Sequence, residues 1–200
     1  MHKSALRKKF YAIRKQTAAH ATNAAKEAVS QLSAHALFAN SHHIACYLAF
    51  RDEIDTLPLI RAIWQSNKIC YLPILQTTRA LKFAQYHEGD LLKPNQFSIL
   101  EPENNASMID PMRLDLVIMP LVAYDKTGNR LGTGGGYYDR TFAFKKTHPH
   151  QKPCLLGFTY ASQEAMGLPH DPWDILLDGV VTEKTVHLFN RSATFRSPPP

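Results

Sequence analysis

The chain has 200 residues, of which 44% are hydrophobic, so it is long enough to bury a core without disulfides or structural metal ions. Its 23 lysine and arginine residues against 17 acidic ones give a formal net charge of +6, which favours anionic partners such as nucleotides, polyglutamate tails or nucleic acid. The basic start is followed by no apolar signal region, and no stretch approaches the roughly 20 apolar residues of a membrane span, so we expect a cytoplasmic protein without a membrane partner.

The first segment, 3–38, is rich in Ala, Lys, Arg and Gln and lacks Pro and Gly, which predicts one or two amphipathic helices. Its apolar stripe consists of Leu6, Phe10 and Ile13. At about 100° per residue, three cations follow the edge of that stripe: Lys3, Arg7 and Arg14. If the stripe packs on the body of the protein, these cations line the seam.

Apolar runs predict buried parallel strands at 43–50, 68–75, 114–119 and 152–158, with shorter strands at 80–86 and 180–181. Thr56 is a candidate N-cap for a helix that contains Pro58 and runs to 66. The segment 91–111, rich in Pro and Asn, is predicted to be irregular. The alternation of strands and helices predicts an α/β fold with a mainly parallel sheet covered on both faces.

The three cysteines are widely spaced in or beside apolar runs and are predicted to be buried, reduced thiols: Cys46, Cys70 and Cys154. The histidines at 42–43, 148 and 150 flank a strand or a proline and are predicted to lie on the solvated surface rather than to bind metal.

The segment 130–140, RLGTGGGYYDR, carries the strongest functional pattern. It follows a turn at 125–128, and its glycines let backbone amides approach an anion closely. A helix that begins near Gly136 would add its free N–H groups. Arg130 suits bidentate binding of phosphate, and Asp139 is an oxygen ligand suited to Mg²⁺. The spacing is neither that of a Walker A loop nor that of a dinucleotide fingerprint.

These residues resemble the signature RLGxGxGYYD of the 5-formyltetrahydrofolate cyclo-ligases. The N-terminal KSALR, the segment RDEIDT at 51–56 and the late segment DILLDGVVT at 174–182 are also similar to that family. The resemblance implies a three-layer α/β/α, Rossmann-like single domain over 1–193. The tail 194–200 is expected to be disordered.

The resemblance also implies an activity: closure of 5-formyltetrahydrofolate, with or without a polyglutamate tail, to 5,10-methenyltetrahydrofolate. ATP phosphorylates the formyl oxygen and ADP and phosphate are released. Arg130 and Asp139 are the implied catalytic residues, and Asp139 and Asp178 the implied Mg²⁺ ligands. The implied ATP-binding residues are Lys3, Ser4, Ala5, Leu6, Arg7, Arg130, Leu131, Gly132, Thr133, Gly134, Gly135, Gly136, Tyr137 and Tyr138. The implied folate-binding residues are Leu48, Glu53, Thr133, Gly134, Gly135, Gly136 and Tyr137.

Several alternatives stay open from the residues alone. Lys3 and Arg7 also fit a solvated helix edge, Glu53 also fits a residue flanking the next helix, and one tyrosine of the pair 137–138 is expected to pack on the sheet. Asp171 or Asp174 can replace Asp178 as the second metal ligand. Other functions in view are a cyclo-ligase-like paralogue with an altered substrate, a sugar-phosphate isomerase or transferase, and a nucleic-acid-binding module, which would leave the glycine-rich loop without a role.

Overall fold

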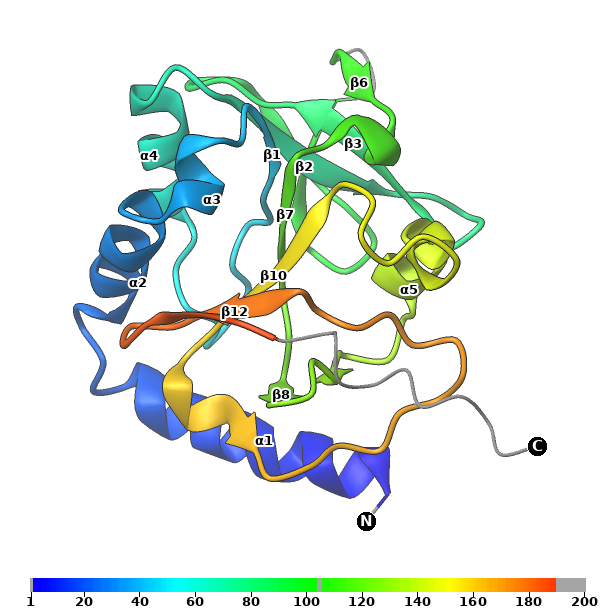
Figure 1. Ribbon diagram of the computed structural model, residues 1–200. Helices are drawn as coiled ribbons and strands as arrows, with labels where there is room; N and C mark the ends of the chain where they lie inside the picture. The colour runs from blue at the N-terminus through cyan, green and yellow to red at the C-terminus, as the bar shows by residue number, and fades with distance from the viewer. Residues whose placement is uncertain (1, 104–105, 190–200) are drawn as a thin grey trace.

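The computed structural model describes residues 2–103 and 106–189 (Figure 1). A central eight-stranded sheet has the order β13-β12-β10-β7-β1-β2-β3-β6. Its strands are β1 (His43–Ala45), β2 (Ile69–Leu75), β3 (Leu81–Gln85), β6 (Met108–Ile109), β7 (Leu116–Met119), β10 (Cys154–Phe158), β12 (Gly179–Val181) and β13 (Val186–Leu188). From β12 to β2 neighbouring strands are parallel, and antiparallel pairs occur only towards the two edges, which confirms the predicted mainly parallel sheet.

The order of the parallel strands creates a crevice at one end of the sheet. Numbered along the chain, β1, β2, β7, β10 and β12 lie in the spatial order 2-1-3-4-5, a doubly wound topology. The order reverses between β1 and β7, which are parallel neighbours. Ligands of open α/β sheets bind outside the carboxyl ends of the strands at such a switch point. The segments that follow β1 and β7 are therefore placed at the position where a ligand is expected.

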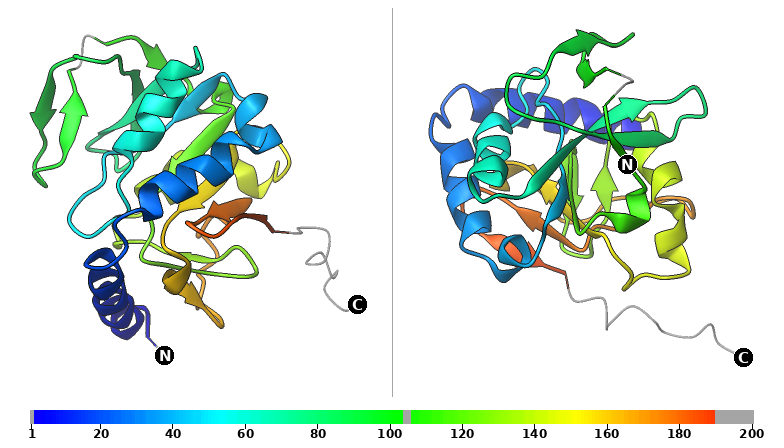
Figure 2. Two further views of the ribbon diagram at one scale, coloured as in Figure 1. Left: turned by 90° about the vertical axis from the view of Figure 1, so that its left-hand side faces the viewer. Right: turned by 90° about the horizontal axis from the view of Figure 1, so that it is seen from above.

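Helices cover the two faces unequally (Figures 1 and 2). On one face, α2 (Ala24–Ser33), α3 (Ala36–Ala39) and α4 (Leu57–Gln65) bury apolar side chains such as Leu32 and Ile60 against Ile44 and Leu116 of the sheet. On the other face, the short α5 (Tyr137–Thr141) and a 3₁₀ turn, Ala143–Lys146, surround the buried Phe142. The predicted three layers are present, and the second helical layer is thin.

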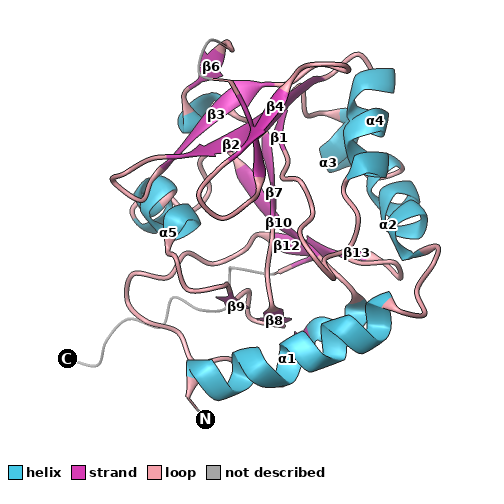
Figure 3. Cartoon of the chain, turned by 180° about the vertical axis from the view of Figure 1, so that it is seen from behind, coloured by secondary structure: helices cyan, strands magenta, loops and turns pink. Residues whose placement is uncertain are grey.

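The first helix, α1 (Lys3–Ala18), lies at the end of the molecule, apart from the layer of α2 to α4 (Figure 3). It packs on the region of a small sheet made of β8 (Ala123–Asp125), β9 (Arg130–Leu131) and β11 (Glu164–Ala165). Leu6 and Phe10 are buried there with Leu131, and Ile13 packs beside them, as the apolar stripe predicted. Because β9 opens the glycine-rich segment, this packing brings the N-terminal cations towards the loop.

The structure departs from the predicted elements in three places. The first strand ends at Ala45 instead of residue 50. The segment expected to be irregular forms a hairpin of β4 (Leu92–Pro94) and β5 (Leu100–Pro102), and then β6. Proline has no backbone N–H to donate. A two-stranded ribbon tolerates it where the backbone nitrogen faces away from the partner strand. Thr56 holds the N-cap position of α4, but its hydroxyl makes no cap hydrogen bond.

Other expectations concern single residues or the ends of the chain. Cys46 and Cys70 are buried and Cys154 is half-buried, and none of the three forms a disulfide bond within the described residues. Burial raises the pKa of the Cys46 thiol to about 12, which keeps it protonated near neutrality. The tail 194–200 and the predicted domain end at 193 lie outside the described residues. Within the described ranges, no helix combines the length and apolar character that crossing a membrane requires.

Candidate active site

A cavity of about 810 Å³ opens at the switch point of the sheet. Its walls come from the segment after β1, the carboxyl end of β2, the residues after β7, the hairpin 92–102, the N-terminal turns of α1 and the loop 130–140. Most of the predicted site residues line it: Lys3, Arg7, Leu48, Glu53, Arg130, Leu131, Gly132, Thr133, Gly134, Gly135, Gly136, Tyr137, Tyr138 and Asp139. Segments far apart in the sequence thus meet around one space.

Four predicted residues are not brought to this cavity. Ser4 and Ala5 are exposed on α1, and Leu6 is buried in the contact with the small sheet. The fourth is Asp178, whose Oδ2 accepts hydrogen bonds from the Lys145 ammonium at 3.2 Å and from the Leu155 amide at 2.7 Å. It precedes β12, at the amino end of the parallel strands, whereas the cavity lies at their carboxyl ends. The predicted proximity of Asp178 to Asp139 is therefore wrong.

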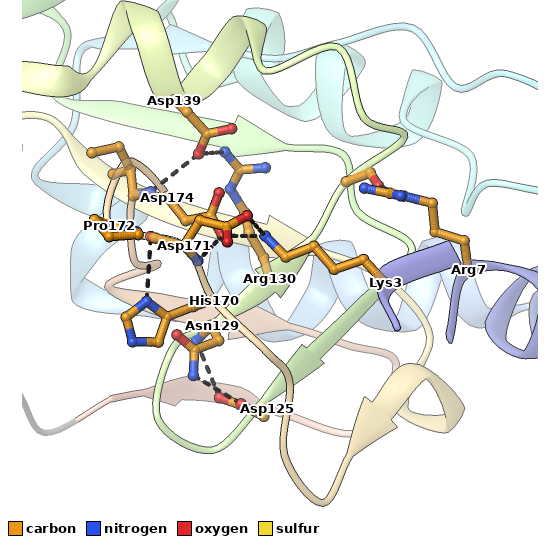
Figure 4. Close-up of polar contacts among 12 residues, drawn as sticks. Lys3, Arg7, Asp125, Asn129, Arg130, Asp139, His170, Asp171, Pro172 and Asp174 are labelled. Carbon is orange, nitrogen blue, oxygen red and sulfur yellow. Dashed lines mark hydrogen bonds and ion pairs between the residues drawn. The ribbon is translucent and has the colours of Figure 1, made fainter. Parts of the chain in front are cut away.

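Asp174 takes the position expected of Asp178. The Asp139 carboxylate accepts hydrogen bonds from Arg130 Nη2 at 2.7 Å and from the Ile175 amide at 3.1 Å (Figure 4). Since Ile175 directly follows Asp174, the second bond ties the two aspartate segments together. Asp174 lines the cavity with Asp171, and both accept hydrogen bonds from the Lys3 ammonium, at 2.6 and 2.7 Å.

The electrostatics of this cluster keep Asp174 ionised. Partial burial opposes its charge, but hydrogen bonds from Lys3 and from the Asp171 amide hold the pKa of Asp174 below its usual value. For Lys3, burial acts against the charged form and the two carboxylates outweigh it, so the pKa of Lys3 is raised. Lys3 is therefore not the solvated helix edge that the sequence also allowed.

Arg130 is almost fully buried, with 6% of its side chain exposed. Besides its ion pair with Asp139, its guanidinium lies 5.9 Å from the ring centroid of Tyr138, and its Nε has no hydrogen-bond partner among the described residues. Tyr138 in turn stacks on Phe142, and burial raises the pKa of its hydroxyl well above the usual value. Tyr137 and Tyr138 both pack against the apolar core on this face of the sheet, and Tyr138 also lies against the guanidinium of Arg130.

The glycine-rich loop adopts the positive φ that its residue types allow. Gly134 has φ +109° and Gly136 has φ +69°, a region that side chains with a Cβ rarely occupy. A helix follows at Tyr137 as predicted, but α5 has only five residues, so its dipole contributes little to anion binding. The loop amides and the surrounding cations are the groups that suit phosphate.

Glu53 lines the cavity from the segment that follows β1. Its Oε2 accepts a hydrogen bond from the Phe50 amide at 3.0 Å, and its Oε1 lies 3.3 Å from Arg14 Nη1. The segment after β1 is fixed by Thr56, whose hydroxyl donates a hydrogen bond to the Tyr47 carbonyl at 2.6 Å. Arg14 was expected in the cationic seam beside Lys3 and Arg7, and the structure instead turns it inward to Glu53.

Sequence reasoning did not find several residues of the cavity wall. The hairpin contributes Phe97, Ile99 and Leu100, and the late segment contributes Trp173, which is 63% exposed. The sequence signal that could have identified these residues was an aromatic residue within each of two polar segments, Phe97 and Trp173. None of the described residues form a cluster of three or more metal-ligating side chains, and His42, His148 and His150 are exposed.

A doubly wound α/β fold, with a cavity at its switch point where a glycine-rich loop meets both cations and carboxylates, defines the class of the protein: a Rossmann-like α/β protein with its ligand cavity at the carboxyl ends of the strands. The model of the 5-formyltetrahydrofolate cyclo-ligase family matches residues 1–183. The 5-formyltetrahydrofolate cyclo-ligase of Escherichia coli K12 is 41% identical over 149 residues, which cover 73% of this chain and 80% of that protein. The chain therefore belongs to the 5-formyltetrahydrofolate cyclo-ligase family.

Two further likenesses agree with this membership. The 5-formyltetrahydrofolate cyclo-ligase of Mus musculus is 30% identical over 157 residues, covering 75% of this chain and 77% of that one. The solved structure of the 5,10-methenyltetrahydrofolate synthetase of Aquifex aeolicus superposes with a TM-score of 0.79 at 30% identity, covering 100% of this chain and 96% of that chain.

Proposed function

We propose that this protein is an ATP-dependent ligase that converts 5-formyltetrahydrofolate to 5,10-methenyltetrahydrofolate and releases ADP and phosphate. The observation that carries the proposal is one continuous cavity that joins the loop of the family signature to the cations of α1 and to Glu53 and Leu48. Its volume of about 810 Å³ lies in the upper part of the range of about 300–1,000 Å³ that is typical of ligand pockets. Residues proposed for ATP and residues proposed for folate line this same cavity.

The reaction explains why the site contains cations and amides rather than a nucleophile. N10 of the folate must attack the N5-formyl carbon, and the formyl oxygen is a poor leaving group. Transfer of the γ-phosphoryl group of ATP to that oxygen gives ADP and an activated formyl carbon. N10 then attacks this carbon and loses its proton, which closes the ring, and the C–O bond breaks to release inorganic phosphate. Phosphoryl transfer needs positioning and charge neutralisation more than covalent help.

The residues divide between the two substrates. Lys3, Arg7 and the loop 130–138 hold the triphosphate, while Leu48, Glu53 and the loop 133–137 contact the folate. Arg130 neutralises charge on the transferring group and is the catalytic residue with Asp139. The buried Nε of Arg130 has no hydrogen-bond partner in the part of the chain that the structure describes, so Asp139 does not use all of its donors. Donors fixed before the reaction need no reorganisation when charge develops.

The carboxylates beside Arg130 fit a Mg²⁺ ion that arrives with ATP. Among the described residues, the hydrogen bonds to Asp139 go to its Oδ1, and those to Asp174 go to its Oδ2. The other oxygen of each carboxylate can therefore coordinate an ion. Mg²⁺ commonly binds to one or two carboxylates together with phosphates and waters. Asp139 and Asp174 would hold the ion, which would neutralise phosphate charge.

The remaining expectations follow from composition and from the family. We propose that the enzyme works in the cytoplasm as a single domain over 1–193, with ATP and 5-formyltetrahydrofolate as its partners and neither nucleic acid nor membrane. A net charge of +6 is compatible with folates that carry a polyglutamate tail.

The test is a direct assay of the purified protein. Formation of methenyltetrahydrofolate is followed by its absorbance in mixtures with 5-formyltetrahydrofolate, with and without MgATP, and ADP is measured in parallel. We expect product only with MgATP, and one ADP for each product. MgATP binding without turnover of the folate would indicate a paralogue with another substrate and would overturn the proposed reaction.

A further inference from the structure

Two arginines hold the carbonyl groups of the glycine-rich loop from its two ends. Arg7 Nε donates a hydrogen bond to the Gly132 carbonyl at 2.8 Å, and Arg140 Nη1 donates to the Gly135 carbonyl at 2.9 Å. In a trans peptide, the carbonyl and the next amide N–H point in opposite directions. Fixing the Gly135 carbonyl on Arg140 therefore also fixes the direction of the Gly136 amide, which points away from that guanidinium.

The backbone is shaped to let Arg140 approach this closely. A Cβ placed on Gly136 would lie 2.5 Å from Arg140 Nη1, so any side chain there would displace the guanidinium. The positive φ of Gly136 independently favours glycine, and a side chain at this position would move Arg140 away from the Gly135 carbonyl.

Arg140 lines the cavity, is exposed, and forms no ion pair with a described residue. Two cations of the cavity wall are in ion pairs with carboxylates, Lys3 and Arg130. Within the described residues, the other three contact backbone carbonyls and no carboxylate: Arg7, Arg140 and Lys146. A guanidinium has five N–H donors, and the carbonyl of Gly135 takes one of those of Arg140. The others are suited to an anionic ligand of the cavity.

We propose that Arg140 is a further ATP-positioning residue, which orients the peptide between Gly135 and Gly136 and places an uncompensated positive charge beside the triphosphate. This inference rests on the proposed function, because it takes ATP as the anion. It gives the residue after the signature aspartate a role in nucleotide affinity rather than in folding, and it predicts that charge and donor geometry at this position both matter.

The test compares three variants with the unmutated protein. Arg140→Gln removes the charge and keeps an amide donor, Arg140→Lys keeps the charge without the planar fork, and Arg61→Gln is the matched control, on an exposed position of α4 outside the cavity wall. MgATP binding is measured by calorimetry without folate, the KM values for both substrates by the absorbance assay, and folding by the thermal midpoint.

We expect Arg140→Gln to weaken MgATP binding and raise the KM for ATP by about tenfold, with the KM for folate within twofold and the thermal midpoint unchanged. Arg140→Lys should recover part of the loss, and Arg61→Gln should behave as the unmutated protein. Two outcomes would overturn the inference. In the first, Arg140→Gln binds MgATP within twofold of the unmutated protein. In the second, its MgATP affinity falls but its thermal midpoint falls as well. Failure of the unmutated protein to bind MgATP overturns the proposed function as well.

Discussion

The guanidinium of Arg14 and the carboxylate of Glu53 form a buried ion pair between α1 and the segment after β1, with Nη1 and Oε1 3.3 Å apart. Only 6% of the arginine side chain and 12% of the glutamate side chain are exposed. Burial raises the pKa of Glu53, and the Phe50 amide and Arg14 counteract only part of that rise. The charge of a residue proposed to contact folate therefore depends on a helix that also carries Lys3 and Arg7.

Glu53→Gln is expected to impair the use of folate more than the binding of ATP. The substitution keeps the shape of the side chain but removes the charge, so the KM for folate should rise about tenfold, as for the loss of one charge-assisted hydrogen bond. Calorimetric MgATP affinity should stay within twofold. A fall in MgATP affinity with unchanged folate binding would show that the two halves of the cavity are assigned the wrong way round.

Arg14→Met is expected to move the acidic limb of the pH profile of kcat/KM for folate to higher pH. Arg14 lowers the pKa of Glu53, so its removal raises that pKa further and leaves more Glu53 protonated at a given pH. The profile is measured over the full stability range of the variant. An unchanged acidic limb would show that ionised Glu53 is not needed.

The same substitution should also alter stability in a pH-dependent way. The pKa of Glu53 is higher in the folded protein than in the unfolded chain. Protonated Glu53 therefore stabilises the fold fully at pH values below its pKa in the unfolded chain, and this stabilisation is lost as the pH rises through its pKa in the folded protein. The unpaired charge in Arg14→Met should cost roughly 3 kcal/mol near neutrality and less in acid. The double variant Arg14→Met/Glu53→Gln, which has no buried charge to pair, should regain much of that stability in urea titrations.

Asp139→Asn and Asp178→Asn are expected to separate catalysis from folding. The first weakens Mg²⁺ binding, so kcat should fall on the order of 100-fold, and it leaves the buried guanidinium of Arg130 without its carboxylate, which should cost about 2 kcal/mol of stability with the fold intact. The second leaves the buried ammonium of Lys145 without its carboxylate and should cost about 2 kcal/mol of stability with near-normal kcat. Turnover at limiting Mg²⁺ and urea unfolding measure the two effects. Near-normal turnover of Asp139→Asn would remove Asp139 from the site.

Lys3→Ala and Arg7→Ala are each expected to raise the KM for ATP about tenfold, with a smaller effect on kcat. Loss of Lys3 leaves Asp171 and Asp174 unneutralised beside the phosphates, and loss of Arg7 frees the Gly132 carbonyl. Higher Mg²⁺ should therefore rescue Lys3→Ala more than Arg7→Ala. Exposed Lys8 on the same helix provides the control Lys8→Ala, which should leave both KM values unchanged. Unchanged ATP dependence in both variants would contradict the assignment.

Substrate labelled with ¹⁸O in its formyl group is expected to give labelled inorganic phosphate. The label leaves the folate only through the phosphorylated formyl oxygen, so unlabelled ATP and water should still yield singly labelled phosphate in mass spectrometry. Unlabelled phosphate, formed while methenyltetrahydrofolate accumulates, would mean that ATP hydrolysis is coupled to ring closure by another route.

The parallel core and the position of the site were predictable because their signals are local. Continuous apolar runs predicted strands such as β7 and β10, and the glycine-rich segment, bracketed by Arg130 and Asp139, indicated an anion site. The family resemblance added Leu48 and Glu53, and the structure places both on the cavity wall.

The misplaced residues depend on partners far away in the sequence. Asp174 and Asp178 occupy similar local sequence, and they differ because Asp174 meets Lys3 while Asp178 meets Lys145, at separations of 171 and 33 residues. Arg14 turns inward because Glu53, 39 residues away, is buried beside it. Helical periodicity places a side chain on a face, but it does not reveal which charged partner that face will meet.

Helix α1 has a consequence for how the two substrates influence each other. Lys3 in its first turn forms ion pairs with Asp171 and Asp174 of the late segment. Arg14, further along the helix, forms an ion pair with Glu53. If ligand binding tilts α1, both contacts move together, and we expect binding in one half of the cavity to change the affinity of the other half. Thermodynamic linkage is reciprocal: the factor by which bound ATP changes folate affinity must equal the factor by which bound folate changes ATP affinity.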